Sequence, residues 1–146
     1  MKQVICFLLV CILQMSSSAY ARDTIGDYSI QEAMDLEQSK SALGENIKFF
    51  FGDQSHGKVA KTFGEFRTSK KTNAFNKTDK AACQWAFLSA MISLKDRAIR
   101  EGGNAVIDIK SNYKNHITSS SSTFQCGSGA IIAGVALVGT VVKIGK

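Results

Sequence analysis

Four cysteines and two histidines are the side chains of this 146-residue chain best suited to redox, nucleophilic or metal chemistry. Cys6 and Cys11 lie in an N-terminal apolar run, which leaves Cys83 and Cys126. Cys83 and Cys126 do not form the C-x-x-C motif that redox-active pairs commonly use. Zinc sites need about four ligands at short spacings, and His56 and His116 lie far from both cysteines in the sequence. The pair is therefore best interpreted as one structural disulfide, which requires an oxidising compartment.

The common motifs of nucleotide and hydrolytic chemistry do not occur in the sequence. There is no G-x-x-x-x-G-K-[ST] phosphate loop, no G-x-S-x-G elbow and no H-E-x-x-H zinc motif. The glycine pair at 102–103 precedes an expected strand, whereas a phosphate-binding loop opens a helix. We therefore expect no cofactor, no metal and no enzymatic activity, ATP hydrolysis included. The alternative is a secreted enzyme or toxin whose site assembles from scattered residues such as His56, His116, Asp53 and Lys71.

Four lysines lie close together in the sequence around one aromatic residue. Lys70, Lys71, Lys77 and Lys80 surround Phe75. Basic residues next to an exposed ring can bind single-stranded nucleic acid or an anionic lipid head group. The same composition is also typical of a solvated loop that leads into a helix. These lysines are candidate anion contacts, with binding that we expect to be weak and to fall steeply with salt.

The N-terminus has the layout of a secretory signal peptide. Lys2 supplies a positive charge, an apolar run of about ten residues follows, and Ala19-Tyr20-Ala21 matches an A-x-A cleavage site. The run is too short to span a membrane. We expect cleavage after Ala21, a periplasmic or secreted mature chain that begins at Arg22, and no transmembrane span in that chain. The full chain has a net charge of +6, and the loss of Lys2 lowers it by one, which still favours anionic surfaces.

Hydrophobic periodicity and glycines divide the mature chain into one long helix and several strands. Residues 22–45 are expected to form a polar lead-in with at most a short helix. The apolar run at 130–142 is uncharged but too short for a membrane span, so we expect core strand, with a membrane-inserting segment as the alternative. The other expected strands are 47–51, 59–72 and 104–113, and the serine run 119–122 is an expected loop.

Alternation along 104–113 predicts which side chains of that strand face the core. Ala105, Ile107 and Ile109 have one parity, and Val106, Asp108 and Lys110 have the other. Because successive strand residues point to opposite faces, we expect the face of the first three to be buried and the other face to be wet.

The long helix is expected to begin after Thr78, a favourable N-cap, and to end at the glycine pair 102–103. Cys126 shares one face of a strand with Phe124, so a strand packed under the helix can bring Cys126 to Cys83. The closed loop spans about 43 residues, which the chain-entropy relation equates with ~4 kcal/mol of stability. The helix stripe expected to face the core steps by three or four residues and contains Cys83, Ala86, Phe87, Ala90, Met91, Leu94 and Ala98.

These elements predict an α+β fold. The expected organisation is a signal peptide at 1–21, a polar lead-in at 22–45 and one α+β domain at 46–146. The domain has one sheet of about four to five strands, one long helix packed on the sheet, and one disulfide.

Four stretches of the chain resemble a family of small secreted bacterial proteins that are often labelled "excinuclease ATPase subunit". They are IKFFFGDQ, GEFRTSKKTNAFNKTDKAACQWAFLSAMISL, GGNAVIDIKSNYK and CGSGAIIAGVALVGTVVKI. The label conflicts with the sequence, because excision-repair ATPases carry nucleotide and zinc motifs that do not occur here.

More distantly, a helix ending in a glycine pair, an NAV strand and a late GVAL strand resemble YbjQ-like domains and the Rcs stress-sensor lipoprotein. This resemblance implies a small α+β domain with the Cys83 helix on one face of a sheet. Membrane attachment and signalling are not implied, because the chain lacks a lipobox and has only one cysteine pair after the signal peptide.

The sequence favours a non-enzymatic secreted or periplasmic protein that binds another envelope or extracellular macromolecule. Two rival hypotheses remain open. One is the enzyme or toxin with a site around His56 and His116. The other is a weak binder of nucleic acid or anionic lipid through the segment from Lys70 to Lys80.

Overall fold

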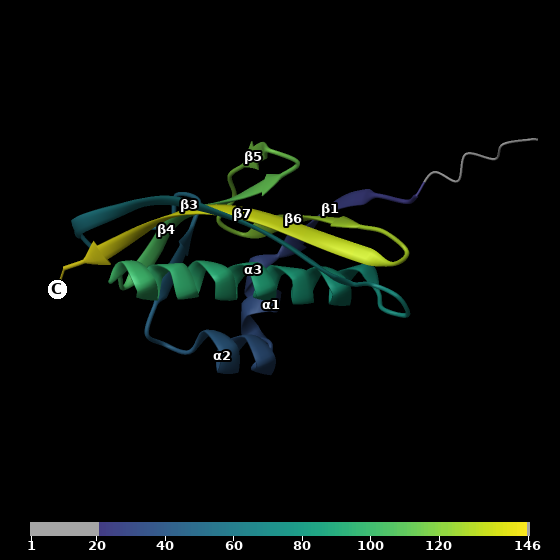
Figure 1. Cartoon of the computed structure of the whole chain (residues 1–146), viewed down its shortest axis with the longest axis horizontal. Helices are drawn as coiled ribbons and strands as arrows, with labels where there is room; N and C mark the ends of the chain where they lie inside the picture. Colours follow the sequence, from purple (N-terminus) through teal and green to yellow (C-terminus); the bar gives the residue numbers. More distant parts are fainter. Residues whose placement is uncertain (1–20, 146) are drawn as a thin grey trace, which may run out of the picture.

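The computed structural model describes residues 21–145, so the predicted signal peptide lies outside the described residues apart from Ala21. One long helix, α3, runs beneath a curled sheet, and two short helices pack below it (Figure 1). In chain order the elements are β1 Thr24–Ser29, α1 Ile30–Asp35, α2 Glu37–Leu43, β2 Lys48–Phe51, β3 Val59–Asn73, α3 Asp79–Glu101, β4 Ala105–Tyr113, β5 His116–Thr118, β6 Thr123–Ser128 and β7 Ile132–Ile144.

Helix α3 begins and ends where the sequence predicts. The Oγ1 atom of Thr78 accepts a hydrogen bond from the backbone N–H of Ala81 at 3.1 Å, which satisfies one of the free donors of the first turn. Gly102 adopts the left-handed conformation, with φ of 83°, and ends the helix. Every residue of the predicted core-facing stripe is at most 1 % exposed. The helix therefore buries one apolar face against the sheet, as expected.

Strand β7 is the centre of the sheet. It pairs antiparallel with β3 along nearly its whole length. On its other side it pairs with β4 over residues 137–142 and with β6 over residues 133–134. β2 pairs with β4 in parallel, and β5 forms a short antiparallel hairpin with the end of β4. β1 pairs antiparallel with the outer edge of β6. The predicted α+β fold with one long helix is confirmed, and the sheet has seven strands, more than expected.

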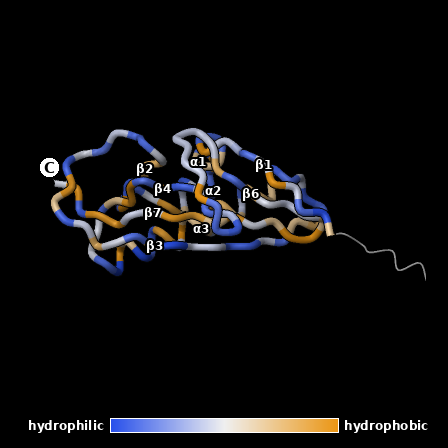
Figure 2. Tube along the Cα trace, turned by 90° about the horizontal axis from the view of Figure 1, so that it is seen from above, coloured by the Kyte–Doolittle hydropathy of each residue, from blue (hydrophilic) through white to orange (hydrophobic). Residues whose placement is uncertain are grey.

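Strand β7 contains the apolar run that the sequence assigned to the core. Side chains of one parity, including Val135 and Leu137, pack in the core between the sheet and α3. Viewed from above, β7 lies between β3 and β4, and hydrophobic residues follow its path (Figure 2). Within residues 21–145, no helix is long and apolar enough to cross a membrane.

Residues 22–45 form a strand of the sheet and two short helices, whereas the sequence predicted a polar lead-in with at most a short helix. β1 pairs with β6 from Thr24 opposite Ser128 to Ser29 opposite Thr123, and α1 and α2 follow it. β1 was missed because its side chains are mostly polar and none of them is buried, so it shows no hydrophobic alternation. The sheet therefore begins before residue 46.

The expected parity of β4 is wrong before Asp108, where Val106 lies in the core and Ile107 does not, whereas Ile109 is buried as expected. Asp108 has φ of 52° and forms a bulge, so the register to β7 shifts between Ile107 and Lys110. The extra residue reverses which side chains point inward. Val106 and Ile109 are both fully buried in the core, while Ile107 is only partly buried.

Candidate functional site

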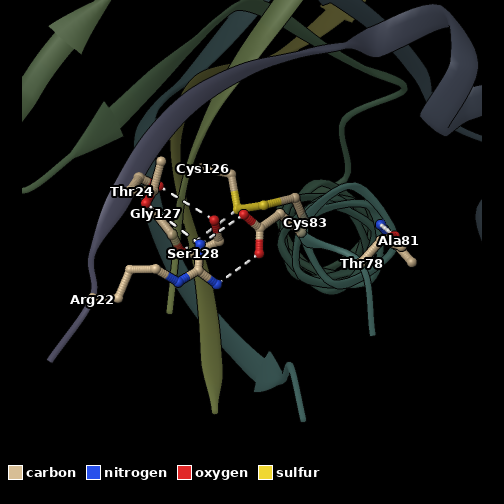
Figure 3. A network of polar contacts seen from close by, with 9 residues as sticks. Arg22, Thr24, Thr78, Ala81, Cys83, Cys126, Gly127 and Ser128 are labelled. Atoms are coloured by element: carbon tan, nitrogen blue, oxygen red, sulfur yellow. Dashed lines mark hydrogen bonds and ion pairs between the residues drawn. A yellow bond between two sulfur atoms is a disulfide. The ribbon is translucent and has the colours of Figure 1, made fainter. Parts of the chain in front are cut away.

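The disulfide predicted from the sequence is present between Cys83 and Cys126. It joins the second turn of α3 to β6, and both cysteines are 0 % exposed (Figure 3). Phe124 lies two residues before Cys126 and stacks on Phe87 of α3, with ring centroids 4.2 Å apart. The bridge holds the helix against the sheet. Because its sulfurs are inaccessible, it offers no reactive group to solvent.

A polar network ties the start of the described chain to the same corner. The guanidinium of Arg22 donates two hydrogen bonds to the Asp79 carboxylate, at 2.8 and 2.9 Å, and Ser128 Oγ donates to the Thr24 carbonyl (Figure 3). The hydrogen bonds from Arg22 hold the pKa of Asp79 below its ordinary value. These contacts anchor β1 beside the first turn of α3. Their polar groups are already paired, so this corner is structural.

The two histidines lie on different elements of the fold. His56 lies in the loop between β2 and β3, where its Nδ1 donates to the Gly57 carbonyl at 2.8 Å and its ring packs edge-on against Phe50. His116 is exposed on β5, and no hydrogen bond in the described part of the chain joins the two residues. Among residues 21–145, no three side chains of His, Cys, Asp or Glu gather closely enough to hold a metal.

The four candidate lysines do not form one cluster. Lys70 pairs with Val135 and lies on the face of the sheet that α3 covers, whereas Lys71 pairs with Gly134 and lies on the opposite face. Lys77 donates to the Asn73 carbonyl at 2.8 Å, and Lys80 forms an ion pair with Glu32 of α1. The segment that looks continuous in sequence is therefore divided among three surfaces.

A group of exposed apolar side chains lies close to two of these lysines, and we call it the apolar tip. It consists of Phe75 in the β3–α3 loop, Ile131 in the β6–β7 turn and Ile132 at the start of β7, which are 63 %, 66 % and 52 % exposed. Figure 1 shows both turns at the end of the molecule opposite the C-terminus. Lys71 and the apolar tip line a shallow hollow of about 440 Å³.

The backbone around the apolar tip is held by hydrogen bonds. The N–H of buried Ala74 donates to the Ile131 carbonyl at 2.6 Å, which joins the two turns. The N–H of Phe75 donates to Asn73 Oδ1 at 2.8 Å. The apolar side chains are thus presented by ordered turns.

The charge around the apolar tip is positive. Neither residues 70–78 nor residues 129–134 contain Asp or Glu. Within the described chain, no ion pair involves Lys70, Lys71 or Lys77. Sequence reasoning selected Phe75 and the lysines but assigned Ile131 and Ile132 to a buried strand. Only the pairing of the two turns reveals that these isoleucines face solvent beside Phe75.

Comparisons with protein-family models, with curated proteins and with solved structures find no match to this chain.

Proposed function

We propose that this protein is a non-enzymatic, secreted or periplasmic binding protein whose apolar tip contacts an anionic lipid surface. The observation that carries the proposal is the combination of Phe75, Ile131 and Ile132, all largely exposed, with Lys71 and Lys77, neither of which forms an ion pair among residues 21–145. Apolar side chains that enter the head-group region, together with lysines that attract anionic lipid, are the two signals that reversible membrane binding needs.

The size of these effects agrees with a peripheral contact. Burying one Phe or Ile side chain contributes roughly 1.5–3 kcal/mol, and a lysine near an anionic surface contributes about 1 kcal/mol. Three partly exposed apolar residues and two or three lysines therefore supply enough free energy for reversible adsorption. They do not supply enough for permanent insertion.

A protein partner from the envelope is the second candidate. A stable protein interface covers about 800 Å² on each partner, usually with a packed apolar centre and a polar rim. The apolar tip has only three exposed apolar residues on two turns, which is small for such an interface. It also lacks acidic residues, which favours an anionic surface over a protein interface whose rim carries charges of both signs.

The proposed compartment rests on the predicted N-terminal signal peptide and agrees with the disulfide. N-terminal sequencing of exported protein is expected to read Arg-Asp-Thr-Ile, from cleavage after Ala21. Protein recovered from the cytoplasm with Met1 retained would contradict this compartment.

Vesicle co-sedimentation tests the function. Mature protein is mixed with phosphatidylcholine vesicles, with and without one-third phosphatidylglycerol, at low and near-physiological salt. We expect binding to the anionic vesicles that weakens with salt, and at least tenfold weaker binding of the double variant Phe75→Ser/Ile131→Ser, since about 3 kcal/mol or more of apolar burial is lost.

The matched control is Ile99→Ser/Ile117→Ser, which removes two isoleucines that are 51 % and 52 % exposed on other elements. It should bind vesicles like the wild type. Equal loss in both double variants, or no binding to anionic vesicles at low salt, would contradict the proposal. Capture of a single envelope protein by the wild type and not by the Phe75→Ser/Ile131→Ser variant would support the protein-partner alternative.

A further inference from the structure

A polar hollow of about 250 Å³ adjoins the apolar tip. Its lining shares Lys71 and Ile132 with the shallow hollow at the tip, so the two spaces are neighbours on the molecule. An Ile132 side chain that enters a lipid surface therefore brings this space to the depth of the head groups. We call it the glycine hollow, and the lining residues that matter here are Asp23, Ser69, Lys71, Tyr113, Gly127 and Gly134.

The glycine hollow lies on the face of the sheet that α3 does not cover. Lys71 pairs with Gly134 of β7, next to the core residue Val135, so the side chains of Lys71 and Ser69 point away from α3. Both residues are exposed. Figure 1 shows the β4–β5 hairpin rising above this same face, and Tyr113 is the last residue of β4. The polar groups of the hollow are therefore open to a ligand from solvent.

Close packing at two glycines gives the hollow its shape. The Tyr113 hydroxyl lies against Gly127, where a Cβ atom would be 1.8 Å from the phenolic oxygen. A Cβ atom on Gly134 would lie 3.6 Å from Lys71 Cγ and 3.8 Å from Tyr113 Cε2, so these two side chains flank residue 134. The absence of side chains at both glycines therefore lets Tyr113 lie close to the sheet beside Lys71.

The Asp23 carboxylate gives the hollow an acceptor that a site for a simple anion does not need. It accepts hydrogen bonds from the Tyr113 hydroxyl, at 3.1 Å, and from Lys114. The Asp23 side chain remains 39 % exposed, and a carboxylate offers about four lone-pair positions, so it can accept further hydrogen bonds from a ligand. The exposed Ser69 hydroxyl can both donate and accept. These groups suit the hydroxyls of a ligand.

The charge of the hollow suits a ligand with one negative charge. Lys114 offsets Asp23, and Asp79 offsets Arg22, which also lines the hollow. Lys71 forms no ion pair among residues 21–145, so its charge is the one that is not offset. A lipid phosphodiester carries one negative charge, which matches this single lysine.

We propose that the glycine hollow selects anionic lipids whose phosphodiester head group carries hydroxyls, such as those of glycerol or of a sugar ring. Lys71 contacts the phosphodiester, while Asp23 and Ser69 bind the hydroxyls. This selectivity rests on the proposed lipid contact of the apolar tip, because Lys71 and Ile132 belong to both spaces.

Vesicles of equal charge test this selectivity. Mature protein is titrated with phosphatidylcholine vesicles that contain one-third phosphatidylglycerol or one-third phosphatidylethanol, which has the same phosphodiester but no head-group hydroxyl. We expect binding to phosphatidylglycerol to be at least about fivefold tighter, because hydrogen bonds to a charged group are strong. Vesicles with phosphatidylinositol distinguish the sources: tighter binding than to phosphatidylglycerol indicates a ring polyol, and weaker binding indicates glycerol.

Two variants and one control assign the selectivity to the hollow. Asp23→Ala should bring the ratio of the two affinities, phosphatidylglycerol to phosphatidylethanol, close to one. It also frees Lys114, but the added charge acts on both lipids alike and leaves the ratio unaffected. Ser69→Ala should lower the ratio about twofold or more. Ser121→Ala removes another exposed serine, in the β5–β6 loop outside the hollow, and should keep the wild-type ratio.

Equal affinity of the wild type for the two anionic vesicles would overturn this inference and leave the proposed lipid contact intact, because both lipids carry the same charge. Failure to bind either vesicle would instead contradict the proposed function, and the inference with it. The inference is also overturned if Ser69→Ala and Ser121→Ala both keep the wild-type ratio. If Asp23→Ala does not fold, this comparison of the two serine variants decides the question.

Discussion

Asp79 shows how single contacts at the start of the described chain stabilise the fold. The two hydrogen bonds from Arg22 lower the pKa of Asp79 below its ordinary value of 3.8. Hydrogen bonds from Lys114 and Tyr113 lower the pKa of Asp23 in the same way. Both carboxylates favour the folded state in their charged form, so their contribution is present above pH 4 and is lost as the pH falls through the lowered folded pKa values.

We therefore predict acid sensitivity that depends on Asp79. The melting temperature of the wild type should fall as the pH drops below about 4, where carboxylates begin to protonate. Asp79→Asn should melt a few degrees lower than the wild type at neutral pH, and its melting temperature should fall less on acidification. Calorimetry from pH 7 to pH 2.5 measures both effects, with the exposed Asp53→Asn as control. An unchanged acid slope in Asp79→Asn would show that this pair does not couple to folding.

At the element scale, the bulge in β4 decides which side chains reach the core. Asp108 adopts φ of 52°, a conformation that Asp and Asn tolerate but β-branched residues do not. The bulge allows both Val106 and Ile109 to be buried, which regular alternation forbids.

Substitution of Asp108 tests the bulge. Asp108→Val should lower the free energy of unfolding by about 1–2 kcal/mol more than Asp108→Asn, because valine is strained at positive φ. The Asn variant removes the exposed ion pair with Lys110 equally, so it controls for charge. Urea denaturation provides the comparison. Equal stability of the two variants would mean that β4 does not bulge at this residue.

The sequence predicted the elements with strong periodicity and missed those whose signal is non-local. Helix α3, its caps and its buried stripe follow from a period of three to four residues that the structure confirms. β1 escaped because an edge strand of polar residues has no hydrophobic pattern, and its pairing with β6 depends on distant residues. The Asp108 bulge escaped because a single inserted residue leaves the local pattern looking regular.

The residues of the apolar tip also differ in how well the sequence predicted them. Phe75 and its neighbouring lysines were visible as an aromatic residue among basic ones. Ile131 and Ile132 were not, because apolar residues at the start of a strand look buried until the turn is placed.

At the scale of the whole molecule, the disulfide links the helix layer to the sheet. It closes a loop with a sequence separation of 43 residues, so its removal should lower the free energy of unfolding by about 4 kcal/mol. Cys83→Ala/Cys126→Ala and wild type in reductant should unfold at similar urea concentrations, both well below the oxidised wild type. The native oxidised protein should show no free thiol, and two reactive thiols in that form would contradict the bridge.

The central claim is that the apolar tip enters an anionic lipid surface. Paramagnetic broadening by NMR tests it most directly, with the mature protein bound to small bilayer discs of phosphatidylcholine and phosphatidylglycerol that contain a lipid with a nitroxide on its acyl chain. The amide signals of Phe75, Ile131 and Ile132 should broaden strongly, while that of Ile117, equally exposed on β5, should remain sharp. Uniform broadening, or broadening at Ile117 without broadening at the apolar tip, would contradict the account.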